Sequence, residues 1–201
     1  MSSPPEFPSS PDSAIRLDSQ PRAAPPDLVV MGVAGSGKST IARALAERAG
    51  CVLVEGDDFH PPENIRKMSA GIALTDDDRR EWLARIAQQL HDHPTGLVVS
   101  CSALKRAYRD RLRAAAPGLR FAFLAITPEL ARERVLARVG SHFFPLTVLD
   151  SQFATLEDPS GEPGVLRLDG ALPAAELTAR ILAWSGTLAS PAPDSNEPTK
   201  S

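Results

Sequence analysis

The chain has 201 residues, of which 42% are hydrophobic and 23% are charged, and its formal net charge is −3. This length fits one compact domain with short tails, and the small negative charge gives no electrostatic basis for binding nucleic acid. No apolar run approaches the ~20 residues that span a bilayer, so we expect a cytoplasmic protein that binds neither nucleic acid nor membrane.

Both ends of the chain differ in composition from its middle. Residues 1–26 are rich in proline and serine, lack the apolar segment of a signal peptide, and predict a disordered tail. Residues 187–201 have the same character and predict a second disordered tail. We therefore expect one domain over residues 27–186. Cys51 and Cys101, the two cysteines of the chain, are expected to be buried reduced thiols.

Short apolar runs alternate with amphipathic stretches in this domain, which predicts a parallel sheet covered by helices. The predicted strands are 28–32, 51–55, 97–101, 120–126 and 164–168. The predicted helices are 38–49, 61–70, 76–92, 104–116, 128–139, 145–156 and 173–185. Ligands of open α/β sheets bind beyond the carboxyl ends of the strands, so the loops that follow the strands form the candidate site.

The first of these loops carries the clearest motif. The stretch MGVAGSGKST, residues 31–40, follows a strand and fits the G-x-x-x-x-G-K-[ST] template of a phosphate-binding loop (P-loop). Its glycines let backbone N–H groups converge on an anion, and the following helix adds a positive dipole. Lys38 is expected on the β- and γ-phosphates and Ser39 on Mg²⁺. The predicted nucleotide-binding residues are Gly32, Val33, Ala34, Gly35, Ser36, Gly37, Lys38, Ser39 and Thr40.

Two neighbouring carboxylates, Asp57 and Asp58, follow the second predicted strand. A carboxylate at this edge of the sheet accepts the proton of an attacking hydroxyl or holds a water on Mg²⁺. Either residue can instead cap the helix that begins at Pro61-Pro62. We expect Asp57 to be the working carboxylate and Asp58 to be the cap.

Polar stripes follow on two predicted helices. His60, Asn64 and Lys67 fall on one helical face, and Lys105 and Arg109 share a face one turn apart. On spacing alone, a solvated face explains both stripes as well as a binding site does.

A predicted helix start lies between the two stripes. Thr75 and Asp78 have the spacing of a capping box, with acidic residues at the positive end of the helix. This interpretation accounts for the acidic run. It leaves Arg79 to face either a bound anion or the solvent.

Arginines and histidines complete the set of candidates. Arg132, Arg134 and Arg138 lie in a helix that runs into a Gly-Ser break, where a mobile segment would bring positive charge to a transferring phosphoryl group. The four histidines form no metal-ligand pattern. His91 and His93, near a helix end, are expected to complement its dipole.

Four segments of the chain resemble the small P-loop type of gluconokinase, a family related to shikimate kinase. The resemblance covers about residues 27–186 and rests on GVAGSGKST, GDDFHPPENIRKMSAGIALTDDDRREWL, CSALKRAYRDRLR and HFFPLTVLDSQFATLEDP, in the family's order. Many unrelated proteins share the P-loop. The patterns D-x-x-H-P-x-x-N-x-x-K-M, L-x-D-x-D-R-x-x-W-L, C-S-A-L-K-x-x-Y-R and S-Q-F-x-T-L-E are much more specific.

The resemblance implies a five-stranded parallel sheet of order 2-3-1-4-5, flanked by helices and carrying a mobile lid. It also implies ATP- and Mg²⁺-dependent phosphorylation of D-gluconate at its 6-hydroxyl, usually in a homodimer. The catalytic residues that it implies are Lys38, Asp57, and Arg134 or Arg138 in the lid. The substrate-binding residues that it implies are Asp57, His60, Asn64, Lys67, Arg79, Lys105, Arg109 and Gln152.

The chain departs from the family's pattern at two places. The family often has R-x-G-H-F, whereas one extra residue separates Arg138 from His142-Phe143, so the motif does not show which lid arginine reaches the phosphates. Glu81 stands where proline is frequent, which we expect to be harmless on a helix surface.

Three other classes of protein share parts of these patterns. A shikimate- or nucleoside-monophosphate-type kinase of the same architecture also has basic residues for an anionic acceptor. A P-loop switch or ATP-driven machine is disfavoured, because the chain has no N-K-x-D segment and its third predicted strand ends in Ser-Cys-Ser rather than in an acidic pair. A nucleotide-binding module without catalysis is disfavoured by the presence of Lys38, Ser39 and Asp57.

Overall fold

The structure, a computed structural model, describes residues 27–93, 96–137 and 145–186. The two predicted tails lie outside these ranges, as does Arg138 with the Gly-Ser break that follows it. Within the described ranges, no helix combines the length and the apolar character needed to cross a bilayer.

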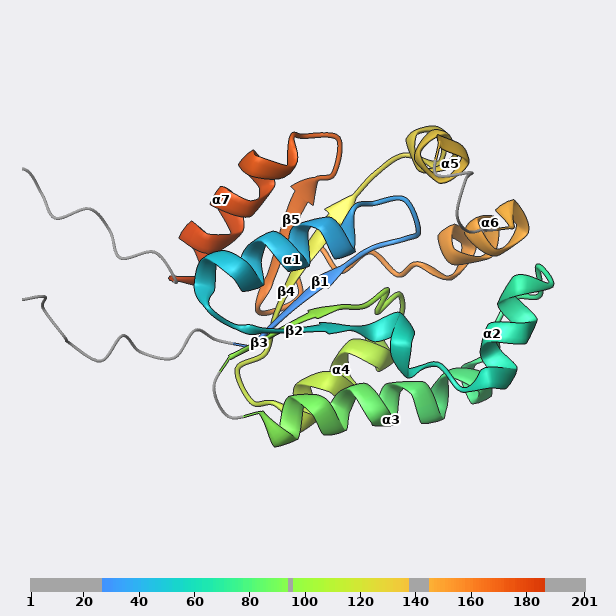
Figure 1. The fold of residues 1–201 in the computed structure, drawn as a ribbon, viewed down its shortest axis with the longest axis horizontal. Coiled ribbons are helices and arrows are strands. Elements are labelled where there is room, and N and C mark those ends of the chain that lie inside the picture. Colours follow the sequence, from blue (N-terminus) through green and yellow to red (C-terminus); the bar gives the residue numbers. More distant parts are fainter. Residues whose placement is uncertain (1–26, 94–95, 138–144, 187–201) are drawn as a thin grey trace, which may run out of the picture.

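Five parallel strands form one sheet in the order β2-β3-β1-β4-β5 (Figure 1). They are β1 (Leu28–Met31), β2 (Val52–Glu55), β3 (Leu97–Ser100), β4 (Arg120–Ala125) and β5 (Val165–Asp169). β1 lies at the centre, where Val29 is in register with Val99 of β3 and with Phe121 of β4. The predicted fold class and strand order are confirmed, and each predicted strand is within one residue of the observed one at either end.

Seven helices accompany the sheet in the described part of the chain: α1 (Lys38–Ala49), α2 (Pro62–Ser69), α3 (Asp76–Asp92), α4 (Arg106–Ala115), α5 (Pro128–Ala137), α6 (Leu146–Thr155) and α7 (Ala174–Ser185). α1 and α7 cover one face of the sheet, and α3 and α4 cover the other (Figure 1). Both faces are buried, as is usual for a parallel sheet.

The core alternates along β1 as strand geometry requires. Leu28 and Val30 pack toward α1 and α7, with Ile41, Leu45, Leu177 and Ile181. Val29 and Met31 pack toward α3 and α4, with Trp82, Ile86, Leu90, Tyr108 and Leu112. A third cluster joins the P-loop to α5 and α6 through Val33, Leu104, Ala131, Val135 and Leu149. This third cluster holds α5 and α6 beside the candidate site.

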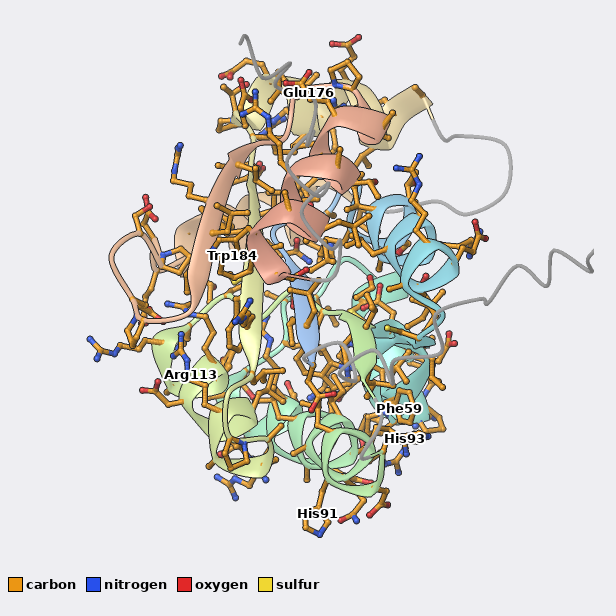
Figure 2. All side chains as sticks on the ribbon, turned by 90° about the vertical axis from the view of Figure 1, so that its left-hand side faces the viewer. Phe59, His91, His93, Arg113, Glu176 and Trp184 are labelled. Atoms are coloured by element: carbon orange, nitrogen blue, oxygen red, sulfur yellow. The ribbon has the colours of Figure 1, made fainter. Side chains whose placement is uncertain are left out.

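Helix ends show which capping predictions hold. The capping box of α3 is confirmed, since the Thr75 side chain accepts from Asp78 N and the Asp78 carboxylate accepts from Thr75 N. At the other end of α3, His93 contacts Gln89 O at 2.8 Å, as expected for a histidine near a helix carboxyl end. Figure 2 shows His91 and His93 at this end of the helix.

The prediction that Asp58 caps α2 is wrong. A 3₁₀ turn, Gly56–Phe59, holds both aspartates, and the N-cap of α2 is Pro61, which makes no side-chain capping bond. Pro62 opens the helix without an N–H group of its own, which lessens the need for a cap. The turn leaves both Asp57 and Asp58 exposed at the carboxyl end of β2.

The two cysteines are free, as predicted. Cys101 is fully buried, and burial raises its pKa to about 12, so this thiol is inert at neutral pH. Cys51 is half-buried rather than buried.

Candidate active site

The P-loop connects β1 to α1 at the carboxyl edge of the sheet. Gly37 is the N-cap of α1 in the left-handed conformation, with φ 95°, and no side chain caps the helix. The first N–H groups of α1 therefore stay available for an anion. The Lys38 ammonium donates to Val33 O at 3.0 Å, which folds this side chain back along the loop.

Gly35 brings the P-loop against α5. Its φ is +79°, and a Cβ at this position would lie 2.8 Å from Ala131 O. A larger residue would therefore force the loop away from α5 and strain its backbone. The template glycines thus serve the packing of the loop as well as its approach to phosphate.

Ser39 lies in the first turn of α1, beside the end of β3. Its hydroxyl lies 3.3 Å from the hydroxyl of Ser100, a buried residue at the carboxyl end of that strand. No cluster of three histidine, cysteine or acidic residues that could hold a metal occurs in the described ranges. Mg²⁺ does not need such a cluster, because it keeps several waters and takes one or two protein oxygens beside substrate phosphates. The Ser39 hydroxyl at the P-loop fits this requirement.

A cavity of about 490 Å³ opens beside the P-loop. It is lined by residues from the P-loop, the 3₁₀ turn, α2, α3 and α6, including nine of the predicted site residues: Ala34, Gly35, Gly37, Lys38, Ser39, Asp57, His60, Arg79 and Gln152. These residues are far apart in the sequence. The fold therefore brings a phosphate-binding loop, a carboxylate and a cation to one hollow.

A second cavity, of about 300 Å³, lies against the other side of the P-loop. Gly35 and Gly37 line both cavities. The second cavity is also lined by Ser36, Thr40, Arg134, Gly170 and Leu172. Arg134 donates to Gly170 O at 2.8 Å, which fixes its side chain between α5 and the segment after β5. Two hollows that share one P-loop can hold a nucleotide and an acceptor side by side.

Arg79 is the buried cation of the larger cavity. Its residue is 8% exposed, and one guanidinium nitrogen lies 3.4 Å from the Tyr108 hydroxyl. The guanidinium carbon lies 5.8 Å from the centre of the Tyr108 ring. Within the described ranges Arg79 makes no ion pair at 4.0 Å or less, although a guanidinium in a partly dry site favours a carboxylate partner. An anionic ligand in the cavity would supply that partner.

His60 closes the cavity beside Arg79. The imidazole stacks on the Trp82 indole, with ring centroids 4.5 Å apart and planes 9° from parallel. Trp82 itself is fixed by donating to Gly56 O at 2.7 Å. Burial lowers the pKa of His60 and the Arg79 charge lowers it further, although the Asp57 charge acts in the opposite direction. The ring is therefore neutral at pH 7, with a nitrogen that can donate to or accept from a hydroxyl.

Asn64 and Lys67 support this cavity from outside it. The Asn64 amide donates to Asp78 O at 2.7 Å and lies 3.4 Å from His60 Nδ1. Lys67 pairs with the Asp78 carboxylate at 2.7 Å, and this contact, together with the hydrogen bond from Thr75 N, lowers the pKa of Asp78 to about 2. Neither side chain is among the residues that line the cavity. Both connect α2 to the first turn of α3, which carries Arg79.

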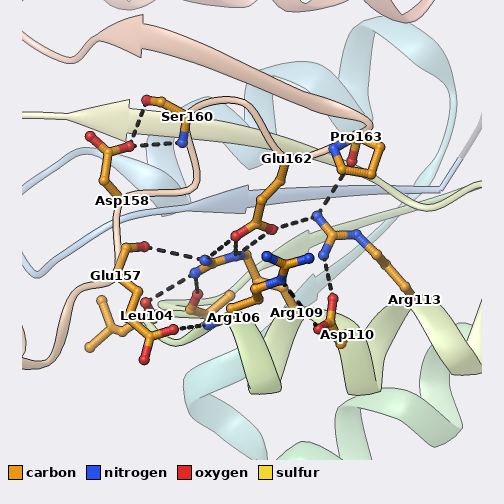
Figure 3. A network of polar contacts seen from close by, with 11 residues as sticks. Leu104, Arg106, Arg109, Asp110, Arg113, Glu157, Asp158, Ser160, Glu162 and Pro163 are labelled. Atoms are coloured by element: carbon orange, nitrogen blue, oxygen red, sulfur yellow. Dashed lines mark hydrogen bonds and ion pairs between the residues drawn. The ribbon is translucent and has the colours of Figure 1, made fainter.

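Arg109 does not reach the cavity, which corrects its expected place in the site. Its side chain is fully buried, its Nε donates to Glu162 Oε2 at 3.0 Å, and its other nitrogens donate to Ala103 O, Leu104 O and Glu157 O (Figure 3). Its donors are thus directed at protein acceptors. The expected face shared with Lys105 is also wrong, because α4 begins at Arg106 and Lys105 is its extended N-cap residue.

Lys105 contacts a protein carboxylate rather than the cavity. Its ammonium lies 2.8 Å from both carboxylate oxygens of Asp76, the first residue of α3. It does not line the cavity. Among the predicted acceptor-site cations Lys67, Arg79, Lys105 and Arg109, only Arg79 lines the cavity.

Gln152, Arg132 and Arg138 are the remaining predicted residues. Gln152 of α6 lines the larger cavity and accepts from Ala34 N of the P-loop at 2.6 Å. Arg132 forms an exposed ion pair with Asp150 between α5 and α6. Arg138 lies outside the described residues.

Three contributors to the site were missed from the sequence. Trp82, Ser100 and Tyr108 were not among the predicted site residues, and all three are buried. Their polar atoms contact the site's surroundings: Gly56 O, the Ser39 hydroxyl and Arg79. The D-R-x-x-W and K-x-x-Y patterns were the available signal, because buried tryptophan and tyrosine usually find a hydrogen-bond partner.

Known proteins place the chain in a family. Residues 28–159 match the family model described as an AAA domain. The gluconokinase of Gluconobacter oxydans is 47% identical over 147 residues, which cover 71% of this chain and 82% of the relative. The thermosensitive gluconokinase of Escherichia coli is 41% identical over 146 residues, covering 70% and 77%. The crystal structure of a gluconokinase from Sinorhizobium meliloti, at 52% identity, matches with a TM-score of 0.76 over 82% of this chain and 94% of that one. The chain therefore belongs to the gluconokinase family of P-loop kinases.

Proposed function

We propose that the protein transfers the γ-phosphoryl group of ATP to the 6-hydroxyl of D-gluconate, giving 6-phospho-D-gluconate and ADP. The observation that carries this proposal is the position of Arg79, a buried cation in the cavity that also holds Asp57 and the P-loop. The relatives of this chain are named gluconokinases, so a shikimate- or nucleotide-type acceptor is not favoured. In this proposal, one open-chain sugar acid lies between Arg79 and the P-loop.

The nucleotide side of the reaction uses the P-loop. Its N–H groups and the positive end of α1 bind the phosphates, and Lys38 swings from Val33 O to the β- and γ-phosphates. Ser39 would hold Mg²⁺, which when bound neutralises charge that develops between these phosphates. The second cavity, beside Arg134, receives the nucleoside. Arg134 is our candidate for the catalytic or nucleotide-binding arginine of the expected lid.

The acceptor must be bound at the end that lies far from its reacting hydroxyl. Gluconate carries its carboxylate at one end and its reacting hydroxyl at the other, so fixing the far end selects the terminal hydroxyl. Arg79 binds the carboxylate with charge-assisted hydrogen bonds, and His60 contacts a hydroxyl between the two ends of the acceptor. Asp57 accepts the proton of the attacking hydroxyl. Gln152 is placed to contact both the acceptor and the P-loop. We also propose that the active form is a homodimer, which light scattering would test.

Product analysis tests this proposal directly. The protein, ATP, Mg²⁺ and gluconate are incubated, ADP release is followed by a coupled assay, and phosphorus NMR locates the phosphate on the product. We expect ADP release that depends on gluconate and a phosphomonoester on the terminal carbon. Lys38→Ala should lose on the order of 10²-fold or more in rate while staying folded. Phosphate on another carbon, or equal ADP release without gluconate, would contradict the proposal.

A further inference from the structure

Arg79 has a potential competitor for its ligand on its own helix. Asp76 lies one turn before it on α3, at the i,i+3 spacing at which side chains of opposite charge meet. The hydrogen bonds from Lys105 and Tyr108 are the main causes of the lowered pKa of Asp76, and the charge of Arg79 adds to them. An ion pair between the two would neutralise the cation that we assign to the substrate carboxylate. The structure holds them apart, with no ion pair between them among the described residues.

Lys105 is the residue that engages Asp76 instead. Its ammonium lies 2.8 Å from both oxygens of the carboxylate, although the two residues are 29 positions apart in the chain. The ion pair joins the N-cap of α4 to the first residue of α3. The Asp76 contact is also the first cause of the raised pKa of Lys105, so both groups stay charged at neutral pH.

Tyr108 lies between this ion pair and Arg79. Its hydroxyl donates to Asp76 Oδ1, which leaves the phenolic oxygen as the acceptor for the guanidinium of Arg79. The same ring faces both cations, with Arg79 at 5.8 Å and Lys105 at 5.9 Å from its centre. A phenol orients the guanidinium without cancelling its charge, whereas a carboxylate in its place would cancel it.

We propose that Lys105 is a positioning residue for the acceptor site: by holding Asp76, with Tyr108 as the bridge, it keeps this carboxylate off Arg79 and leaves Arg79 as a free cation for the acceptor anion. This inference rests on the proposed function and adds a determinant of acceptor affinity that does not touch the acceptor. It also explains why a lysine and a tyrosine three residues apart at the start of α4 both point at the start of α3.

A double-mutant cycle separates this role from direct binding. Lys105→Met removes the ammonium and keeps an unbranched chain, so Asp76 is released toward Arg79. We expect the gluconate KM to rise about fivefold, the upper range for an exposed ion pair, because the Asp76 side chain is 61% exposed. The ATP KM and kcat should change little. Asp76→Asn should not raise the gluconate KM, since a neutral amide forms no ion pair with the guanidinium and leaves its charge in place.

The double variant is the decisive member of the cycle. With Asp76→Asn present, Lys105→Met should no longer raise the gluconate KM. Arg80→Met is the matched control, because it also removes one positive charge from an exposed aspartate partner, Asp77, and should leave the KM unchanged. The KM defect persisting in the double variant would show direct binding by Lys105 and overturn the proposal. An unchanged KM in Lys105→Met alone would overturn it too.

The proposed function and this inference fail in different ways. A wild-type protein that does not phosphorylate gluconate would refute the function, whatever the variants do. A wild type that uses gluconate, with no rescue by Asp76→Asn, would refute only the role of Lys105. Melting temperatures of all variants close to that of the wild type would show that the KM changes arise in the site.

Discussion

Arg109 and Glu162 form a buried ion pair that ties the start of α4 to the segment before β5 (Figure 3). The Arg109 side chain is 0% exposed and that of Glu162 is 9% exposed. Arg113 joins the same carboxylate at 2.8 Å. The contacts of Arg109 with Ala103 O and Leu104 O also support the turn after β3, where Ala103 has a left-handed φ of 42°. The pair therefore stabilises the loop after β3, in which Ser102 lines the larger cavity.

Arg109→Leu should destabilise the fold rather than weaken substrate binding directly. The change leaves Arg113 as the partner of Glu162 and removes the donor of Ala103 O, Leu104 O and Glu157 O, which costs about 1–3 kcal/mol or more. Urea unfolding of the variant measures this loss. Arg106→Leu is the control, because its ion pair with Asp110 is exposed and should contribute ~0–1 kcal/mol. An Arg109→Leu protein as stable as the wild type, with a raised gluconate KM, would restore Arg109 as a substrate ligand.

Asp57 and Asp58 offer a matched pair for the catalytic carboxylate. Both line the larger cavity from the same turn. We expect Asp57→Asn to lower kcat by about 10²-fold or more with a much smaller change in gluconate KM, since the amide cannot accept the proton. Asp58→Asn should stay within a fewfold of the wild type. Steady-state kinetics of the two variants decide between them, and a larger loss in Asp58→Asn would reverse the assignment.

Arg134 and Arg132 offer a second matched pair, on α5. Arg134 lines the cavity against the far side of the P-loop, whereas Arg132 pairs with Asp150 on the surface. Arg134→Ala should raise the ATP KM or lower kcat at least tenfold, about 1.4 kcal/mol of lost interaction. Arg132→Ala should be near neutral. If the two variants behave alike, α5 contributes no specific contact to the nucleotide.

His60 should make stability depend on pH in the acid range. Burial lowers its folded-state pKa below 6.5 despite the opposing Asp57 charge, and the Arg79 charge acts in the same direction as burial, so the unfolded chain binds the proton more readily. The contribution of neutral His60 to the free energy of unfolding should therefore be complete above pH 6.5. It should be lost as the pH falls from 6.5 through the lower folded-state pKa. Comparing chemical unfolding of the wild type and His60→Gln between pH 5 and 7 isolates this contribution. Identical pH slopes would contradict the lowered pKa.

Much of the fold follows from sequence pattern because the pattern reports burial. β1, β3 and β4 are almost wholly buried, and apolar runs predicted them within one residue of each end. The capping box of α3 was readable because both of its bonds are local. The 3₁₀ turn after β2 was not readable, since its place depends on contacts such as that between Trp82 and Gly56 O.

The candidate site was predicted in part, and the reason differs between two arginines. Arg79 and Arg109 both looked like cations that an anion would need, and both are buried. Their partners separate them: Arg109 meets Glu162, 53 residues further along the chain, whereas Arg79 meets a phenol on another helix. Charge pattern within a helix does not reveal partners that arrive from distant segments. Lys105 shows the same limit, because its partner Asp76 looked like part of a helix start.

Acceptor discrimination tests whether Arg79 anchors an anionic open-chain acceptor. The measurement is kcat/KM for gluconate, glucose and shikimate, in the wild type and in Arg79→Lys. We predict a strong preference of the wild type for gluconate, because neutral glucose leaves the Arg79 charge without a partner in a cavity where its residue is 8% exposed. Arg79→Lys should raise the gluconate KM and leave the ATP KM nearly unchanged, since lysine cannot form two parallel bonds to a carboxylate. Comparable values for glucose, or a preference for shikimate, would show that Arg79 does not anchor gluconate.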